Sequence, residues 1–215
     1  MDKYNANGIL EFFNSHGGEE YRSPAKLTDS AQRQKMEKLY KESKGALGDF
    51  NQLLKKVADD NNLTEVKNKN FLDGSMRKIR TYFWGQMKNA YYFNDPESIS
   101  LFAEKTKDSK SVFRVSLEFD QLHAFSDEIE RFIKALELPL ETGLDYYVSQ
   151  HGHNNVEATK EKASSLKKKV ESGEVEKVLI GTIVTGADDE SVIKNINAAI
   201  KKIMPYYNHV LGIKG

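Results

Sequence analysis

The residues best suited to chemistry lie between Gly74 and Phe93, a segment with many cations and aromatic rings and no acidic residue. Its four cations are Arg77, Lys78, Arg80 and Lys88, and its rings include Tyr82, Trp84, Tyr91 and Tyr92. Cations contact nucleic-acid phosphates, and a flat apolar ring stacks on an exposed base. The segment therefore indicates a nucleic-acid site in which these cations bind phosphates and these rings stack on a base. The alternative is an aromatic-rich core strand with exposed flanking cations.

A second set of residues would suit a metal-dependent nuclease. Glu104, Lys105, Glu118 and Asp120 lie on the two strands of an expected hairpin, where they could converge on a divalent ion. In the segment His151-Gly152-His153 two histidines could share a metal, but no carboxylate or cysteine follows at a motif spacing. A loop with exposed histidines is therefore the preferred interpretation of that segment.

The sequence motifs of several enzyme classes are absent. The chain has no phosphate-binding loop, no glycine-rich dinucleotide motif, no H-E-x-x-H and no nucleophile elbow. We therefore expect a chain without catalytic residues, cofactor or metal, and the nuclease remains the enzymatic alternative.

Composition limits the possible partners. The 215 residues include 32 Lys and Arg and 32 Asp and Glu, so the formal net charge is zero. This balance excludes a basic coat over the whole chain but leaves room for a local basic site. The absence of cysteine excludes disulfides, thiol catalysis and thiolate zinc sites. No segment approaches the ~20 apolar residues of a membrane span, and the first residues lack a signal-peptide pattern. We expect a cytoplasmic protein with no membrane partner.

The elements that must position these residues suggest a single α+β domain over residues 1–215, with a helical part over 1–70. A first helix around Ile9 to Phe13 should end at Gly17-Gly18. Ser23-Pro24 and Thr28-Asp29-Ser30 are start signals for a second helix, which should be interrupted by Gly45 and Gly48. A third should follow over Phe50 to Val57.

Residues 71–215 should form a central antiparallel sheet with helices packed on it. TYFWGQMKNAYYF suggests a strand, a bend at Gly85 and a second strand, and ISLFAEK and SVFRVSLEFD form a hairpin around the turn Thr106 to Lys110. In the second hairpin strand Phe113, Val115, Leu117 and Phe119 should be buried, whereas Arg114, Ser116, Glu118 and Asp120 should face water.

The C-terminal part alternates helical and apolar segments. Residues 126–138 predict a helix capped at Ser126-Asp127-Glu128, a polar stretch from Ser149 leads to a lysine-rich helix, and VLIGTIV predicts a buried strand. The last helix should be capped by Asp188 or Asp189 and stopped by Pro205.

This order of elements resembles the N-terminal DNA-binding domain of McrB-type modification-dependent restriction proteins. The resemblance rests on TYFWGQMKN, ISLFAEKTKDSKSVFRVSLEFD, the helix over 127–138, the stretch over 171–180 and NINAAIKKIMPYYNHV. It implies recognition of a modified cytosine in DNA, with the base flipped into an aromatic pocket. Because no GTPase module is present, restriction activity would belong to another chain or domain, such as a separate nuclease or NTPase subunit.

We thus favour a non-catalytic module that binds duplex DNA, recognises a methylated cytosine by base flipping and acts in a restriction or defence system. Two alternatives remain: the metal-dependent nuclease, and a protein-interaction domain in which the aromatic segment is an interface.

Overall fold

The computed structural model describes residues 4–67, 69–74, 77–106, 108–119, 125–150 and 156–213. Its helices are α1 (Ala6–His16), α2 (Ser30–Asp60), α3 (Phe125–Ala135), α4 (Ala163–Glu171) and α5 (Asp189–Leu211), with short 3-10 turns η1 (Pro24–Lys26) and η2 (Ala90–Tyr92). Its strands are β1 (Thr64–Val66), β2 (Leu72–Asp73), β3 (Lys78–Ile79), β4 (Tyr82–Lys88), β5 (Glu97–Lys105), β6 (Ser111–Phe119), β7 (Asp145–Gln150), β8 (Glu157–Thr159) and β9 (Val175–Val184).

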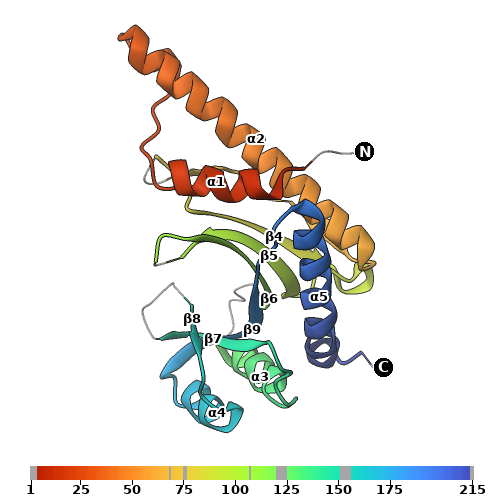
Figure 1. Cartoon of the computed structure of the whole chain (residues 1–215). Coiled ribbons are helices and arrows are strands. Elements are labelled where there is room, and N and C mark those ends of the chain that lie inside the picture. The colour runs from red at the N-terminus through yellow and green to blue at the C-terminus, as the bar shows by residue number, and fades with distance from the viewer. Residues whose placement is uncertain are drawn as a thin grey trace.

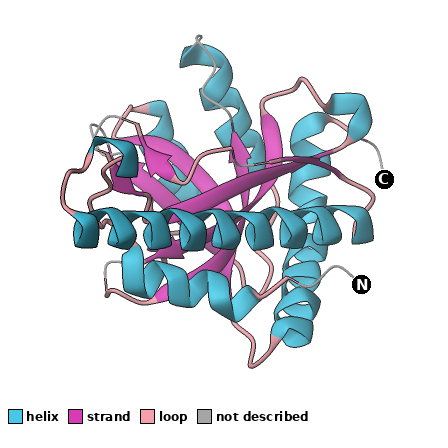
Figure 2. Ribbon diagram, turned by 90° about the horizontal axis from the view of Figure 1, so that it is seen from above, coloured by secondary structure: helices cyan, strands magenta, loops and turns pink. Residues whose placement is uncertain are grey.

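Seven of these strands form one antiparallel sheet in the order β1-β4-β5-β6-β9-β7-β8, and β2 and β3 form a separate small hairpin. Helices α1, α2 and α5 pack against the half of the sheet that contains β4, β5 and β6, whereas α3 and α4 pack against β9. The sheet is strongly curved, and these helices lie outside the curve (Figures 1 and 2). The expected α+β class is confirmed.

The expected hairpin is confirmed as β5 and β6. Lys105 pairs with Ser111 around the turn, and the register continues to Glu97 opposite Phe119. Phe113, Val115 and Leu117 are fully buried toward the helices, as the alternation predicts. The expectation that Arg114, Ser116 and Glu118 face water is wrong, because each is at most 4% exposed. Asp120 lies outside the described residues.

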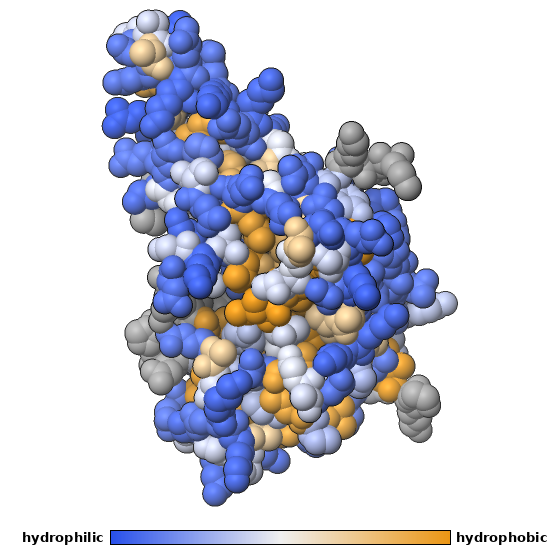
Figure 3. All heavy atoms as spheres, in the orientation of Figure 1, coloured by the Kyte–Doolittle hydropathy of each residue, from blue (hydrophilic) through white to orange (hydrophobic). Residues whose placement is uncertain are grey.

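The expected break at Gly45 and Gly48 does not occur, because α2 is continuous over 31 residues. Each glycine costs about 1 kcal/mol in a helix interior. That cost is offset by a buried stripe on the same helix that includes Leu47, Phe50 and Leu54. The first half of α2 extends beyond the sheet (Figure 1), and its surface is largely hydrophilic (Figure 3).

The last helix begins where expected but does not stop at Pro205. Asp188 caps α5 in a capping box with Ser191, and the helix continues to Leu211, after which Gly212 adopts the left-handed conformation. Proline removes one backbone hydrogen bond and costs about 3 kcal/mol in a helix interior. Tyr206 and Tyr207 follow the proline and are buried, so tertiary packing holds the last turns helical.

Four strands differ from the expectation. β4 runs straight through Gly85 and ends at Lys88, after which η2 takes the place of a second strand. A Cβ on Gly85 would lie 2.3 Å from Leu54 Cδ2, so the glycine permits close packing of α2 on β4. β8 and the end of β7 lie in the polar stretch from Ser149, which was expected to be loop, and β1 lies within the part expected to be helical.

The other predicted helices are present. The helix over 126–138 is α3, the lysine-rich helix is α4, and VLIGTIV forms the second part of β9. The capping side chains Ser126, Asp127 and Glu128 lie outside the described side chains. No helix within the described ranges is both long and apolar enough to span a membrane.

Candidate nucleic-acid interface

On β4, β5 and β6, every second side chain points away from the helices, toward the inner side of the curved sheet. Residues that pair across antiparallel strands point to the same face. Trp84 pairs with Phe102, and Phe102 pairs with Arg114, so these three side chains form one row across β4, β5 and β6. The next row is polar, because Gln86 pairs with Ser100 and Ser100 with Ser116. We call this surface the inner face.

Arg114 is the centre of the inner face. Its Nε donates to Glu104 Oε1 at 2.7 Å and its Nη2 to Glu104 Oε2 at 3.3 Å, which makes a two-point contact. Its Nη1 donates to Ser116 Oγ at 2.7 Å and to Glu118 Oε1 at 3.4 Å. The guanidinium carbon lies 4.0 Å from the Phe102 ring centre and 5.3 Å from that of Tyr147 on β7. Arg114 therefore links β5, β6 and β7 through charge and ring contacts.

The surroundings keep Arg114 charged. Burial on its own would lower the pKa of the guanidinium, but the hydrogen bonds and charge of Glu104 and the charge of Glu118 raise it above its usual value. Lys177 on β9 contacts Glu118 Oε2 at 3.0 Å. Two carboxylates and two cations thus balance each other, so the inner face has a neutral, hydrogen-bonded floor.

Aromatic rings line the start of β4 on the same face. Trp84 and Phe102 are stacked, with ring centres 6.1 Å apart and planes 23° apart. Tyr82, two residues before Trp84, is 40% exposed, and the Arg80 guanidinium lies 5.7 Å from its ring centre. Trp84 Nε1 has no hydrogen-bond partner within the residues that the structure describes. An exposed ring therefore lies beside a stacked pair with a spare donor.

Cations gather at the end of the sheet where β4 starts. Arg77 and Lys78 lie on the β2–β3 hairpin, and Arg80 Nε donates to the carbonyl of Leu72. The Lys105 amide donates to the carbonyl of Thr81, the residue before β4, at 2.9 Å, which places Lys105 at the same end of the sheet. Lys110 is exposed in the β5–β6 turn. We call Arg77, Lys78, Arg80, Lys105 and Lys110 the basic end.

Arg77 has an unusual backbone. Its φ is 51°, in the left-handed region that favours glycine. Its amide donates to the Asp73 carbonyl at 3.0 Å and its carbonyl accepts from the Tyr21 amide at 2.9 Å. The Arg77 side chain is exposed. Local backbone hydrogen bonds therefore hold a charged, exposed residue in a strained turn.

The structure divides the predicted site residues between the two ends of β4, which spans about 20 Å at the usual rise of a strand. Arg77, Lys78, Arg80 and Tyr82 lie near one end, and Trp84 follows on the inner face. Lys88, Tyr91 and Tyr92 belong to the other end.

That second group is heterogeneous in exposure. Lys88 is only 5% exposed, and its Nζ donates to the Asp95 carbonyl at 2.7 Å. Tyr91 is 94% exposed and Tyr92 is half-buried on η2. The structure therefore does not bring the eight predicted residues together into one site.

The acids proposed for a nuclease are engaged with cations. Glu104 is bound by Arg114, and Glu118 by Arg114 and Lys177. Within the described residues there is no group of three or more His, Asp or Glu side chains placed to hold a metal ion. Asp120, His151 and His153 lie outside those residues.

Sequence reasoning missed Arg114, Phe102 and Tyr147 as parts of a shared surface. The predicted turn from Thr106 to Lys110 could have revealed the contact between Phe102 and Arg114, because pairing of Lys105 with Ser111 places these two residues opposite each other. Tyr147 could not be found in this way, since β7 pairs with β9 far along the chain.

A curved antiparallel sheet with helices on its outer side and a polar, aromatic inner face defines the protein only as an α+β protein. No family model matches the chain, and no curated protein or solved structure is significantly similar to it.

Proposed function

We propose that the protein is a non-catalytic module that binds duplex DNA and recognises a methylated cytosine. In this proposal the basic end contacts phosphates, and a flipped base stacks on Tyr82 beside the Trp84–Phe102 pair. A second polypeptide would supply any nuclease or NTPase activity, and the complex would act in the cytoplasm.

The observation that carries the proposal is the exposed Tyr82 ring between the basic end and the inner face. A ring that is 40% exposed offers a stacking surface, and Arg77, Lys78 and Arg80 lie within a few residues of it. Glu104, which pairs with Tyr82 across the strands, is neutralised by Arg114. The carboxylate directly beside Tyr82 is therefore neutralised, while the exposed acids of this end, Glu20 beside Lys78 and Asp108 in the turn of Lys110, lie next to cations of the basic end.

The unpaired indole N–H of Trp84 supports base recognition on the same face. A buried donor without an acceptor costs about 1–3 kcal/mol. A base carbonyl or ring nitrogen could accept this hydrogen bond after a small movement of the side chains around it. Flipped bases are recognised by stacking between rings and by hydrogen bonds to their edges.

The test measures anisotropy of labelled duplexes with plain or methylated cytosine at several salt concentrations. Each phosphate contact contributes about 0.9 to the slope of log affinity against log salt, so Arg77→Ala/Lys78→Ala should reduce that slope by about 2. Tyr82→Ala should lower the preference for the methylated duplex, because stacking on one ring contributes about 1–3 kcal/mol. Trp84→Phe, which keeps a ring but removes the N–H, should also reduce this preference.

The matched control is Lys201→Ala, which removes an exposed cation from α5. It should leave both the salt slope and the preference unchanged. Absence of salt-sensitive binding to either duplex would refute the proposal. Equal losses for Lys201→Ala and for the double variant would show that any binding is spread over the surface.

A further inference from the structure

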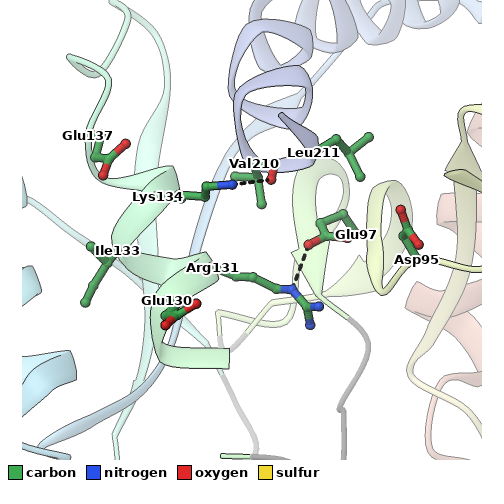
Figure 4. A pocket seen from close by; sticks show the side chains of 9 residues that line it. All are labelled: Asp95, Glu97, Glu130, Arg131, Ile133, Lys134, Glu137, Val210 and Leu211. Atoms are coloured by element: carbon green, nitrogen blue, oxygen red, sulfur yellow. Dashed lines mark hydrogen bonds and ion pairs between the residues drawn. The ribbon is translucent and has the colours of Figure 1, made fainter. Parts of the chain in front are cut away.

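A second surface lies at the far end of β4, away from the basic end. It is a pocket of about 540 Å³ between α3, the last turn of α5 and the start of β5 (Figure 4). Apolar side chains of Ile133, Val210 and Leu211 form part of its wall. This volume exceeds that of any single amino-acid side chain, so the pocket could admit one from a partner.

The ionisable groups of the pocket are mostly acidic. Its lining holds four carboxylates and two cations: Asp95, Glu97, Glu130 and Glu137 with Arg131 and Lys134. The Glu137 carboxylate is hydrogen-bonded to His209 Nε2 at 2.8 Å. Arg131 Nε contacts Glu97 Oε1 at 2.9 Å and Lys134 Nζ donates to the Val210 carbonyl at 3.2 Å, whereas the buried Arg131 Nη1 has no hydrogen-bond partner within the described residues. The exposed Glu130 has no ion-pair partner in the part of the chain that the structure describes. The pocket thus carries an excess of negative charge.

Glu97 is the most buried acid of the pocket, at 4% exposure. Burial raises the pKa of its carboxyl, and the nearby Asp95 adds to this, while a hydrogen bond from its own backbone and the charge of Arg131 act in the opposite direction. Its ion pair with Arg131 therefore does not fully compensate the loss of water. An additional cation in the pocket would favour the charged carboxylate.

Exposed rings lie beside this pocket. The turn that carries Tyr91 and Phe93 ends at Asp95 on the pocket wall. Tyr91 is 94% exposed and Phe93 is 41% exposed. The turn is held against α5, because the Asn89 amide donates to the Tyr207 hydroxyl at 2.9 Å. A fixed turn that presents two rings to solvent is typical of an interface, where aromatic residues are enriched.

We propose that this surface docks an arginine-bearing segment of a partner polypeptide. The guanidinium binds the carboxylates of Glu97 and Glu130, its aliphatic stem lies on Ile133 and Val210, and Tyr91 and Phe93 contact the flanking residues. A planar guanidinium pairs with carboxylates at two points and stacks on aromatic rings. Phosphates would be repelled by the same carboxylates, so this surface is separate from the proposed DNA contact.

The experiment uses the full chain without DNA and a labelled Gly-Ser peptide that carries arginines. The matched peptide has citrulline at the same positions, which keeps the shape of arginine but removes the charge. The arginine peptide should bind about tenfold or more tightly than the citrulline peptide, in line with the strength of hydrogen bonds between charged groups. Added salt should weaken only the arginine peptide.

Three variants test the location. Glu130→Gln/Glu137→Gln removes two exposed carboxylates and should weaken the arginine peptide while the fold is kept, because a glutamine at position 137 can still hydrogen-bond to His209 Nε2. Glu97→Gln should weaken the arginine peptide from the buried side. Tyr91→Ala should weaken both peptides and leave DNA binding unchanged. Glu171→Gln removes an exposed acid from α4 and should have no effect.

Equal affinity for the two peptides, or no change in Glu130→Gln/Glu137→Gln, would overturn the docking proposal. A loss in Glu171→Gln equal to that in the pocket variants would also overturn it, because the attraction would then be non-specific. Arg77→Ala/Lys78→Ala should retain peptide binding. The peptide experiment can therefore succeed or fail whether or not the protein binds DNA.

Discussion

Replacement of Arg114 by methionine should strongly destabilise the fold. Methionine keeps an apolar stem between Phe102 and Tyr147 but removes every hydrogen bond to Glu104, Ser116 and Glu118. Breaking a buried ion pair by removing one partner costs about 3–5 kcal/mol. The Glu104 side chain is 26% exposed and Glu118 keeps Lys177, so we expect a value near the lower limit, about 3 kcal/mol.

Urea titration of the purified variants measures this change in the free energy of unfolding. Thermal unfolding should show a midpoint lower by about 6–12 °C, since each 1 kcal/mol shifts the midpoint by about 2–4 °C in a protein of this size. Arg114→Met/Glu104→Gln/Glu118→Gln should recover most of the loss, because no carboxylate then lacks a partner on the inner face. Lys177 can reach water in that variant, as its side chain is 32% exposed.

Lys38→Met is the matched control, since it removes a cation from the exposed pair with Glu42 on α2. Its cost should be about 0.3–0.5 kcal/mol. The reasoning is refuted if Arg114→Met costs no more than this control. It is also refuted if the triple variant is no more stable than Arg114→Met, because the loss would then come from packing rather than from unpaired carboxylates.

Three further outcomes follow from single residues. Burial raises the pKa of the Glu97 carboxyl above its ordinary value of 4.5. The stability that protonation of Glu97 provides is therefore complete below pH 4.5 and is lost as the pH rises through the folded-state pKa. In urea titrations above pH 4.5, the free energy of unfolding of Glu97→Gln minus that of the native chain should therefore increase with pH. A difference that does not change with pH would contradict this. Gly85→Ala should lower stability by about 1–3 kcal/mol because of the contact with Leu54, and Leu54→Ala in the same chain should cost less than the sum of the two single changes. Arg77→Gly should stabilise the fold by about 1 kcal/mol, because glycine adopts the left-handed backbone without strain, and it should weaken DNA binding. If the variant lowered both stability and DNA binding, the assignment of Arg77 as an exposed phosphate contact would be contradicted.

The parts of the fold that follow from local pattern were predictable. The alternation of Phe113, Val115 and Leu117 identified a strand and its buried face, and Asp188 identified the start of the last helix. Both depend on neighbours within a few residues, which the sequence displays directly.

The features that depend on distant contacts were not predictable from local pattern. Gly45, Gly48 and Pro205 are helix-breaking residues, but packing against the rest of the molecule keeps α2 and α5 continuous. Arg114 was expected in water because its strand alternates, yet the curvature of the sheet and the ring of Tyr147 bury it. The candidate site shows the same limit, since Lys88 belongs to the predicted basic segment but is buried against the Asp95 carbonyl.

The large sheet has two edges, β1 and β8, which raises the question of how it avoids adding strands from other molecules. Its two outermost strands, β1 and β8, are each three residues long, whereas β5 and β6 in the interior have nine. Short edge strands expose few unpaired backbone groups, and each carries a charged residue, Glu65 in β1 and Glu157 at the start of β8. β1 covers only Gln86 to Lys88 of β4. Aggregation through the sheet edges is therefore disfavoured, and an extension of either edge by a few β-branched residues should create a site for fibril growth.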